Sequence, residues 1–242
     1  MEEETRRQLK EIIANSRRVT FLGGAGVSTD SGLLDFRSPQ GLYNVQSEYG
    51  EPYEVMLSHD YFEYETKTFY DFYWKYMVDL KAKPNKAHYA LAEFEKTHPN
   101  FTLVTQNIDG LHQRAGSKRV LEAHGSILHY HCTVCGKGYE LDDILHEGVP
   151  HCSCGGILKP DVVLYGEGLD NDVIMSSIEA VRRSDVLIIG GTSMRVYPVA
   201  AFPDYFLSGT KIIINNEATP YDAHCDYVIH ENIGDVLQEI LN

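Results

Sequence analysis

Polar residues follow several short apolar runs, and they include a pair that could bind a carboxamide. The octapeptide Thr105-Gln106-Asn107-Ile108-Asp109-Gly110-Leu111-His112 comes directly after the apolar run 101–104. Asn107 and Asp109 stand two residues apart, and an amide with a carboxylate can together donate to a carboxamide oxygen and accept from its NH₂ group. A plain Asn-x-Asp-Gly turn is an equally good interpretation of this segment taken by itself.

One of the eleven histidines is a candidate general base. His124 follows the apolar run 120–121 and precedes Gly125, so we expect it at a strand end, where an imidazole can reach a ligand. Histidine suits the role because its pKa lies near neutrality. Two more polar clusters follow apolar runs and suit a phosphate or ribose: Gly190-Gly191-Thr192-Ser193 and Asn215-Asn216-Glu217.

A glycine-rich stretch near the N-terminus could hold a dinucleotide. It follows the apolar run 19–22 and reads Gly23-Gly24-Ala25-Gly26-Val27-Ser28-Thr29-Asp30-Ser31-Gly32. Such a turn lets backbone N–H groups approach a pyrophosphate, although a glycine-rich turn is often only a turn. Thr29 stands where the G-x-G-x-x-G fingerprint has its third glycine, and no strand is evident where its acidic ribose-binding residue would fall, about 20 residues on. We therefore expect dinucleotide binding unlike that of an ordinary dehydrogenase.

Four of the five cysteines are spaced as metal ligands. Cys132 and Cys135 form a Cys-x₂-Cys pair, and Cys152 and Cys154 form a Cys-x-Cys pair after sixteen intervening residues. This cluster predicts a closed tetrahedral zinc site of structural type. A rival ligand set would replace one cysteine by His129, His131 or His151. The fifth cysteine, Cys225, is most simply a small buried residue.

The elements that must position these side chains are short and apolar. Apolar runs predict strands at residues 19–22, 101–104, 120–121, 162–164, 186–189, 211–214 and 227–229, and helical patterns occupy 1–16, 86–97, 172–183 and 233–241. This alternation predicts a parallel sheet covered on both faces, with ligands at the carboxyl ends of its strands. An aromatic-rich stretch at about 43–83 and the cysteine-bearing stretch at about 126–159 interrupt the pattern, and we expect them to form a smaller lobe.

Composition narrows the function classes. The formal net charge of −14 disfavours nucleic acid and anionic membranes as partners and fits a basic peptide better. No apolar run approaches the ~20 residues of a membrane-spanning helix. The charged N-terminus lacks the apolar core of a secretory signal. We expect a cytoplasmic protein.

Taken in order, these motifs resemble those of the sirtuins, NAD-dependent protein-lysine deacylases, in their short, bacterial-type, single-domain form. The matching segments cover nearly the whole chain. They are Gly24-Ala25-Gly26-Val27-Ser28 with Ser31-Gly32 and Asp35-Phe36-Arg37, the octapeptide from Thr105, His124-Gly125, the four cysteines, Lys159-Pro160-Asp161-Val162-Val163 with Gly166-Glu167, Gly191-Thr192-Ser193 with Val196 and Pro198, and Asn215 with Glu217.

The resemblance implies a role for individual residues. His124 would be the general base, with Asn107 as a second catalytic residue, and the four cysteines would hold one structural zinc. NAD would be consumed as a cosubstrate. Its binding residues would be Ala25, Thr29, Phe36, Arg37, Gln106, Ile108, Asp109, His124, Thr192, Ser193, Asn215, Cys225 and Ile233.

The resemblance also implies a fold and a reaction. A Rossmann-like parallel-sheet domain (residues 1–42, 84–125 and 160–242) would carry a smaller lobe made of a helical module (43–83) and a zinc module (126–159). An acetylated-lysine peptide would add as a strand beside the segment from Val163 to Glu167. The products would be free lysine, nicotinamide and O-acetyl-ADP-ribose.

Some residues depart from the family pattern. Leu34 replaces the usual proline before Asp35, and Tyr165 stands where phenylalanine is frequent. The segment from Phe69 to Trp74 lacks the arginine that would pair with an acidic acyl group, so acetyl or longer apolar groups are expected. Two alternatives use the same cleft: ADP-ribosyl transfer or NAD hydrolysis, and a non-catalytic NAD-sensing module.

Overall fold

Six parallel strands form the sheet of the larger lobe, in the order β3-β2-β1-β7-β8-β9. The computed structural model describes residues 1–33 and 46–241. Counted along the chain, this order reverses between β1 and β7, which makes their carboxyl ends the switch point where doubly wound sheets bind ligands. The strands are β1 (Val19–Gly23), β2 (Thr102–Thr105), β3 (Val120–Glu122), β7 (Val186–Gly190), β8 (Thr210–Ile214) and β9 (Tyr227–Ile229).

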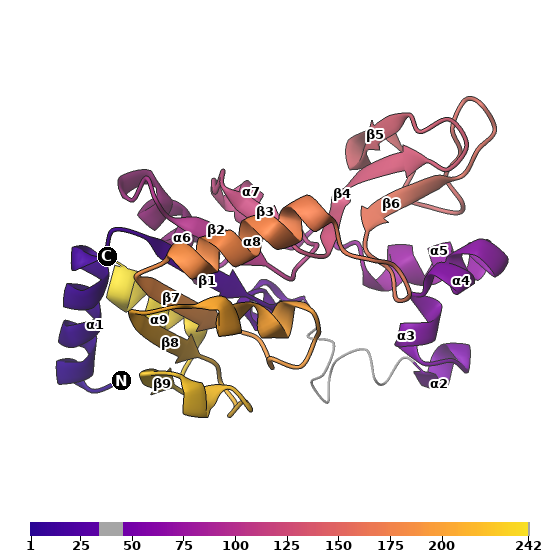
Figure 1. The fold of residues 1–242 in the computed structure, drawn as a ribbon. Helices are drawn as coiled ribbons and strands as arrows, with labels where there is room; N and C mark the ends of the chain where they lie inside the picture. Colours follow the sequence, from indigo (N-terminus) through magenta and orange to yellow (C-terminus); the bar gives the residue numbers. More distant parts are fainter. Residues whose placement is uncertain (34–45, 242) are drawn as a thin grey trace.

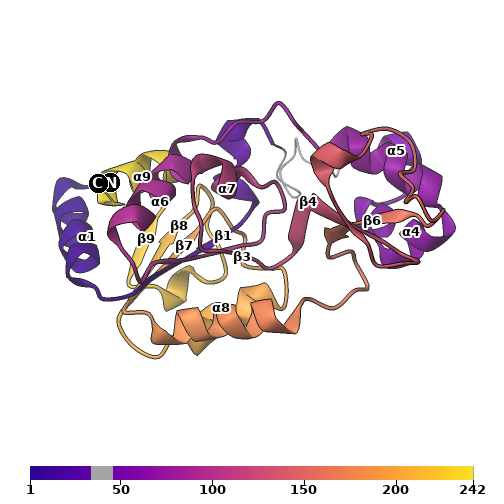
Figure 2. The same cartoon turned by 90° about the horizontal axis from the view of Figure 1, so that it is seen from above.

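Helices cover both faces of this sheet (Figure 1; Figure 2). One face carries α1 (Glu3–Asn15), α6 (Lys86–Thr97) and α9 (Ile233–Leu241), and the other carries α8 (Asn171–Arg183) with the 3₁₀ helix η5 (Val199–Tyr205). Successive strand residues divide between the two cores, since Phe21 packs with the first group and Leu22 with the second. Burial of both faces explains why the strands are continuously apolar.

The smaller lobe lies at one end of the sheet and joins two segments that are far apart in sequence (Figure 1). Its helices are α2 (Gln46–Tyr49), α3 (Tyr53–Met56), α4 (His59–Tyr64) and α5 (Thr66–Tyr76), and its antiparallel strands are β4 (Gly125–Cys132), β5 (Gly138–Glu140) and β6 (Leu158–Val162), in the order β5-β4-β6.

Aromatic side chains of α5 hold this lobe together. Phe69, Tyr70, Phe72 and Tyr73 are fully buried in one core with residues of β4 and β6. The Tyr70 hydroxyl donates to the carbonyl oxygen of Leu158. The aromatic-rich stretch is thus a helical module of the smaller lobe, and its aromatic side chains pack on the cysteine-bearing hairpin and not, as expected from the sequence, on the larger lobe.

One predicted strand belongs elsewhere. The run 162–164 was expected in the parallel sheet, but β6 ends at Val162 and pairs antiparallel with β4. Residues of β6 alternate between buried and more exposed, which is typical of an antiparallel strand with one solvated face. Three apolar residues in a row are too few to separate the two kinds of strand. The five-part division of the chain stays a prediction.

Candidate active site

Two glycine-rich loops meet backbone to backbone at the carboxyl ends of β1 and β7. The N–H of Gly26 donates to the carbonyl oxygen of Gly191 over 2.8 Å, and the N–H of Gly24 donates to that of Gly190 over 3.1 Å. A Cβ at Gly26 would lie 2.8 Å from the Cα of Gly191, and one at Gly24 would lie 2.8 Å from the Cβ of Thr192. These glycines are therefore required first by the close contact between the two loops.

Gln106 links three strand ends. Its backbone N–H donates to the carbonyl oxygen of Gly23 over 2.9 Å, and its side-chain Nε2 donates to Thr192 Oγ1 over 2.9 Å. Its own carbonyl oxygen lies 2.9 Å from Nδ1 of His124. The structure thus brings together Gln106, Thr192 and His124, as predicted from their positions after β2, β7 and β3.

The hydrogen bond to Gln106 sets the tautomer of His124. A carbonyl oxygen can only accept, so Nδ1 of the neutral ring carries the proton and Nε2 keeps a free lone pair. Burial lowers the pKa of His124 below its ordinary value, and the contact with the Gln106 carbonyl opposes that shift in part. The imidazole is therefore neutral near pH 7 and ready to accept a proton at Nε2.

The predicted carboxamide pair is tied to the glycine loop through Ser28. The Ser28 hydroxyl donates to Asp109 Oδ2 over 2.7 Å and accepts from Nδ2 of Asn107 over 3.0 Å. The other oxygen of Asp109 accepts the N–H of Leu111 over 2.9 Å. Ile108, between the pair, accepts the N–H of Ile127 over 2.9 Å and packs against the core of the smaller lobe.

Ser28, Asn85 and His88 were not among the predicted site residues. Nε2 of His88 lies 3.4 Å from the Ser28 hydroxyl, and Nδ1 accepts the N–H of Asn85 at the start of α6. Nδ2 of Asn85 donates to the carbonyl oxygen of Val27 over 2.8 Å. The sequence did contain a sign of the contact between Asn85 and His88. An asparagine three residues before a side chain that can accept a hydrogen bond is a helix-capping pattern.

The remaining predicted nucleotide contacts are spread over the loops after β1, β7, β8 and β9. Asn215 follows β8, and its Nδ2 donates to the carbonyl oxygen of Glu217 over 2.6 Å. Ile233 is buried in the core beneath Gly190. Cys225 is half-buried, and burial raises its pKa to about 11. Ala25 and Thr29 lie in the loop after β1 and Ser193 in that after β7, whereas Phe36 and Arg37 fall outside the described residues, as does Leu34.

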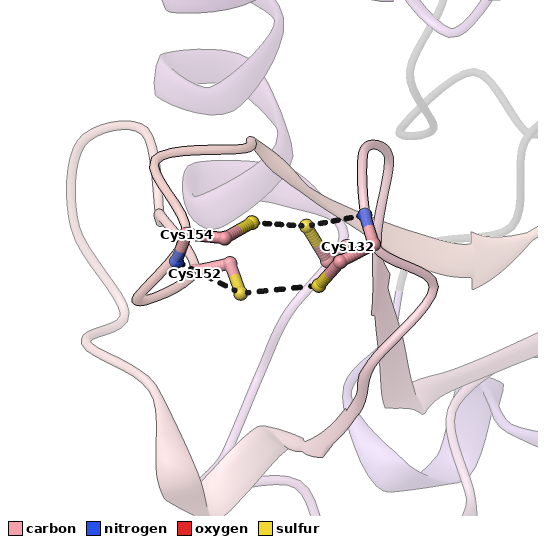
Figure 3. A group of neighbouring side chains, drawn as sticks. Cys132, Cys152 and Cys154 are labelled. Carbon is pink, nitrogen blue, oxygen red and sulfur yellow. Dashed lines mark hydrogen bonds between the residues drawn. The ribbon is translucent and has the colours of Figure 1, made fainter.

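The four predicted metal ligands form one cluster in the smaller lobe (Figure 3). Their sulfur atoms all lie within 4.8 Å of one another, with Cys132 and Cys154 at 3.4 Å and Cys135 and Cys152 at 3.6 Å. Tetrahedral zinc with Zn–S bonds of about 2.3 Å sets its sulfurs about 3.8 Å apart, so this donor set fits the ion.

Hydrogen bonds from neighbouring groups stabilise the thiolate of Cys152. The N–H of Cys154 and the hydroxyl of Tyr139 donate to the Cys152 sulfur, and together they lower its pKa to about 5. A Cβ at Gly156 would lie 2.6 Å from the Cys132 sulfur, so glycine is needed for the close approach. The alternative ligands are engaged elsewhere: Nδ1 of His131, for example, contacts Asp161 over 2.5 Å.

The segment predicted to receive a peptide strand is bonded on one side to His124, which follows β3, and on the other to the helices of the smaller lobe. The N–H of Val163 donates to the carbonyl oxygen of His124 over 3.0 Å. Tyr165 pairs with the end of α3 and the start of α4, since its N–H donates to Leu57 and its carbonyl oxygen accepts the N–H of His59. Within the described part of the chain, the carbonyl oxygen of Val163 and the N–H of Gly166 have no backbone partner.

Comparisons with known proteins agree with one another. The Sir2 family model matches residues 24–198. The NAD-dependent protein deacetylase of Clostridium acetobutylicum is 49% identical over 237 residues, which cover 97% of this chain and 97% of that protein. A solved structure of Sir2 bound to acetylated peptide is similar with a TM-score of 0.85 at 32% identity, over 97% of this chain and 96% of that one. A Sir2 homologue in complex with NAD is similar with a TM-score of 0.87 at 36% identity, over 97% and 92% of the two chains.

Proposed function

The chain belongs to the Sir2 family and is an NAD-dependent protein deacetylase, and we propose that His124 is the general base of its reaction. The observation that carries the assignment is the contact of Nδ1 with the Gln106 carbonyl oxygen, because it holds the proton on Nδ1 and leaves Nε2 as the acceptor. The half-buried ring is neutral near pH 7, as a base must be.

NAD fits the site at the carboxyl ends of β1 and β7. The glycine loops leave backbone close to the switch point, Thr192 and Gln106 present polar groups there, and Asp109 is an acceptor for a carboxamide NH₂ group. When bound, NAD supplies a ribose carbon from which nicotinamide departs and a ribose hydroxyl that receives the acetyl group. The residues of this chain orient the carboxamide through Asn107 and Asp109 and take the hydroxyl proton at His124 Nε2.

The acetyl-lysine peptide is proposed to add as a strand along residues 163–167. Two backbone groups that lack partners within the described residues, the carbonyl oxygen of Val163 and the N–H of Gly166, support this placement. The N–H of Val163 is bonded to His124, so a peptide on this segment would lie beside the proposed base.

We propose a structural role for the zinc ion and a cytoplasmic location for the protein. Four cysteines complete a tetrahedral ion and leave no position for a water, so the site would stabilise the smaller lobe and take no part in the chemistry. Thiols of this kind stay reduced in the cytoplasm. None of the helices in 1–33 and 46–241 is long and apolar enough to cross a membrane. The charge of −14 disfavours direct binding to nucleic acid.

The direct test is incubation with NAD and an acetyl-lysine peptide, with both followed by mass spectrometry. Loss of the acetyl mass, nicotinamide release that depends on peptide, and formation of O-acetyl-ADP-ribose are expected. His124→Ala is expected to bind NAD as the parent does and to keep less than a tenth of its turnover, since general bases typically contribute about 10²–10⁴-fold. Nicotinamide release without peptide, or ADP-ribose attached to protein, would contradict the proposed reaction. More than a tenth of parental turnover in His124→Ala would refute the assignment of the base.

A further inference from the structure

The carboxylate of Glu167 contacts three parts of the smaller lobe at once. Oε2 accepts the N–H of Leu164 over 2.9 Å and the ammonium of Lys159 over 3.1 Å, while Oε1 lies 2.9 Å from Nδ1 of His59. Lys159 belongs to β6, which together with β4 forms the cysteine-bearing hairpin, here called the zinc hairpin. His59 begins α4 of the helical module. One side chain thus joins both modules to the proposed peptide-binding segment.

The same residue closes the turn at the end of that segment. The N–H of Glu167 donates to the carbonyl oxygen of Leu164 over 3.0 Å, and Gly166, with a φ of +90°, stands at the third position of the turn. A left-handed residue there is typical of a type II turn and favours glycine. Both backbone groups of Leu164 are therefore bonded to Glu167, while the Val163 carbonyl oxygen and the Gly166 N–H have no backbone partner among the described residues.

Glu167 is ionised at neutral pH. Burial by itself would raise its pKa, but the N–H of Leu164, the imidazole of His59 and the ammonium of Lys159 outweigh that effect and lower it. The Lys159 ammonium also donates to the carbonyl oxygens of Pro160 and Val162, so its position is set by the backbone of β6. Hydrogen bonds to an ionised carboxylate are about twice as strong as neutral ones, which suits a residue that must hold a loop in one conformation.

We propose that Glu167 is a positioning residue for the peptide: it clamps residues 163–167 between the zinc hairpin and the helical module so that their free backbone groups match an added strand. This inference rests on the proposed peptide site. The contacts of Glu167 affect binding of the substrate residues on either side of the acetyl-lysine, because only an extended peptide pairs with residues 163–167. A single acetyl-lysine has no strand to pair, so its turnover depends on the cleft beside His124 and not on the clamp.

Glu167→Gln keeps the size of the side chain and removes its charge. We expect kcat/KM for an acetyl-lysine peptide of about ten residues to fall about tenfold, the factor that corresponds to ~1.4 kcal/mol. The fall is expected in the KM for peptide, with kcat, the KM for NAD and zinc content unchanged. Turnover of a blocked single acetyl-lysine is expected to change less than twofold. His59→Ala removes one contact only and is expected to shift the peptide KM in the same direction by a smaller factor.

A matched control is available in the same lobe. Nδ1 of His129 lies 2.8 Å from Oε2 of Glu140, a more exposed histidine–glutamate pair on β4 and β5 that takes no part in the contacts of Glu167. Glu140→Gln should leave every constant at its parental value. Equal losses for the peptide and the single acetyl-lysine, no loss for either, or the same loss in Glu140→Gln would overturn the clamp. A parent protein that deacetylates neither substrate would overturn the proposed function itself, which separates the two failures.

Discussion

Two buried histidines predict an unusual loss of stability in mild acid. His88 and His112 have side chains that are 0% and 1% exposed, and their rings lie 4.7 Å apart between centroids. Neither ring nitrogen of His112 has a hydrogen-bond partner among the residues described. Burial lowers the pKa of His112 to about 3, with a further contribution from His88, and burial lowers the pKa of His88 to about 4.

Stability falls with falling pH when the unfolded state binds more protons than the native state. In the unfolded chain a histidine titrates near pH 6.5, so between that pH and about 4 the unfolded state binds protons that the native state refuses. The stability contributed by the neutral rings is therefore complete above pH 6.5 and is lost as the pH falls. At pH 5.5 the loss is about 1.4 kcal/mol for each histidine, or about 2.8 kcal/mol for His88 and His112 together.

The variant His112→Phe isolates one of these contributions. A phenyl ring fills the space of an imidazole and carries no polar atom to bury, so we expect its free energy of unfolding at pH 7.5 to equal or exceed that of the parent. Between pH 7.5 and 5.5 the parent should lose about 1.4 kcal/mol more than the variant. Urea denaturation followed by circular dichroism at both pH values, with zinc content held equal, measures the difference.

The control is His224→Gln, which removes an exposed imidazole outside the cysteine-bearing lobe and should lose as much stability in acid as the parent does. Any effect of pH on the zinc site is common to all three proteins and cancels in the comparison. Equal losses in the parent and in His112→Phe would show that His112 is protonated in the folded protein, and would refute the argument from burial.

Three further predictions concern the base, the zinc and the glycine loops. Because the pKa of His124 is lowered, kcat should stay above half its plateau at pH 6.5, and a midpoint above that value in the pH profile would contradict its environment. The Cys132→Ala variant should lose its zinc, and its smaller lobe should unfold and its activity disappear. Structural zinc contributes about 10–16 kcal/mol of apparent binding free energy in small peptides. A stable, active variant would exclude a structural ion. Gly26→Ala places a Cβ against the Gly191 backbone and should destabilise the protein by about 1–3 kcal/mol in denaturant titrations, whereas Gly168→Ala, which meets nothing within 4 Å, should leave it unchanged.

Local patterns predicted most of the helices and strands and the clustering of four cysteines. The bounds of α6 and α9 match the predicted helices 86–97 and 233–241, because each presents a long apolar stripe at helical spacing. The four cysteines could be grouped from spacing alone, since each pair lies within a single turn. The parallel sheet followed from apolar runs that both faces bury.

Long-range relations were not visible in the sequence. Ser28 and His88 are sixty residues apart and meet only because α6 packs beside the loop after β1. The run 162–164 reads as a buried strand, and only its pairing with β4 or with the parallel sheet decides its lobe. Glycines 24 and 26 were expected to admit a pyrophosphate, and their first requirement is the Gly191 loop against which they lie.

The donor and acceptor of each hydrogen bond around Ser28 are fixed by its neighbours. The Asn85 N–H can only donate, so Nδ1 of neutral His88 accepts and Nε2 carries the proton. Ser28 then accepts from Nε2 of His88 and from Asn107, which leaves its single hydrogen for Asp109. Asp109 therefore offers only lone pairs to the site, as an NH₂ group of a carboxamide requires.

This assignment of donors and acceptors requires a neutral His88. Protonation would set an N–H of its ring against the Asn85 N–H, break the cap of α6 and release the hold on Ser28. Protonation of His88 in the folded protein, which its lowered pKa places near pH 4, would therefore disorder the carboxamide site. We expect the KM for NAD to stay constant from pH 7 to about pH 5, where folded His88 is still neutral although stability has begun to fall, and to rise only as the pH approaches about 4.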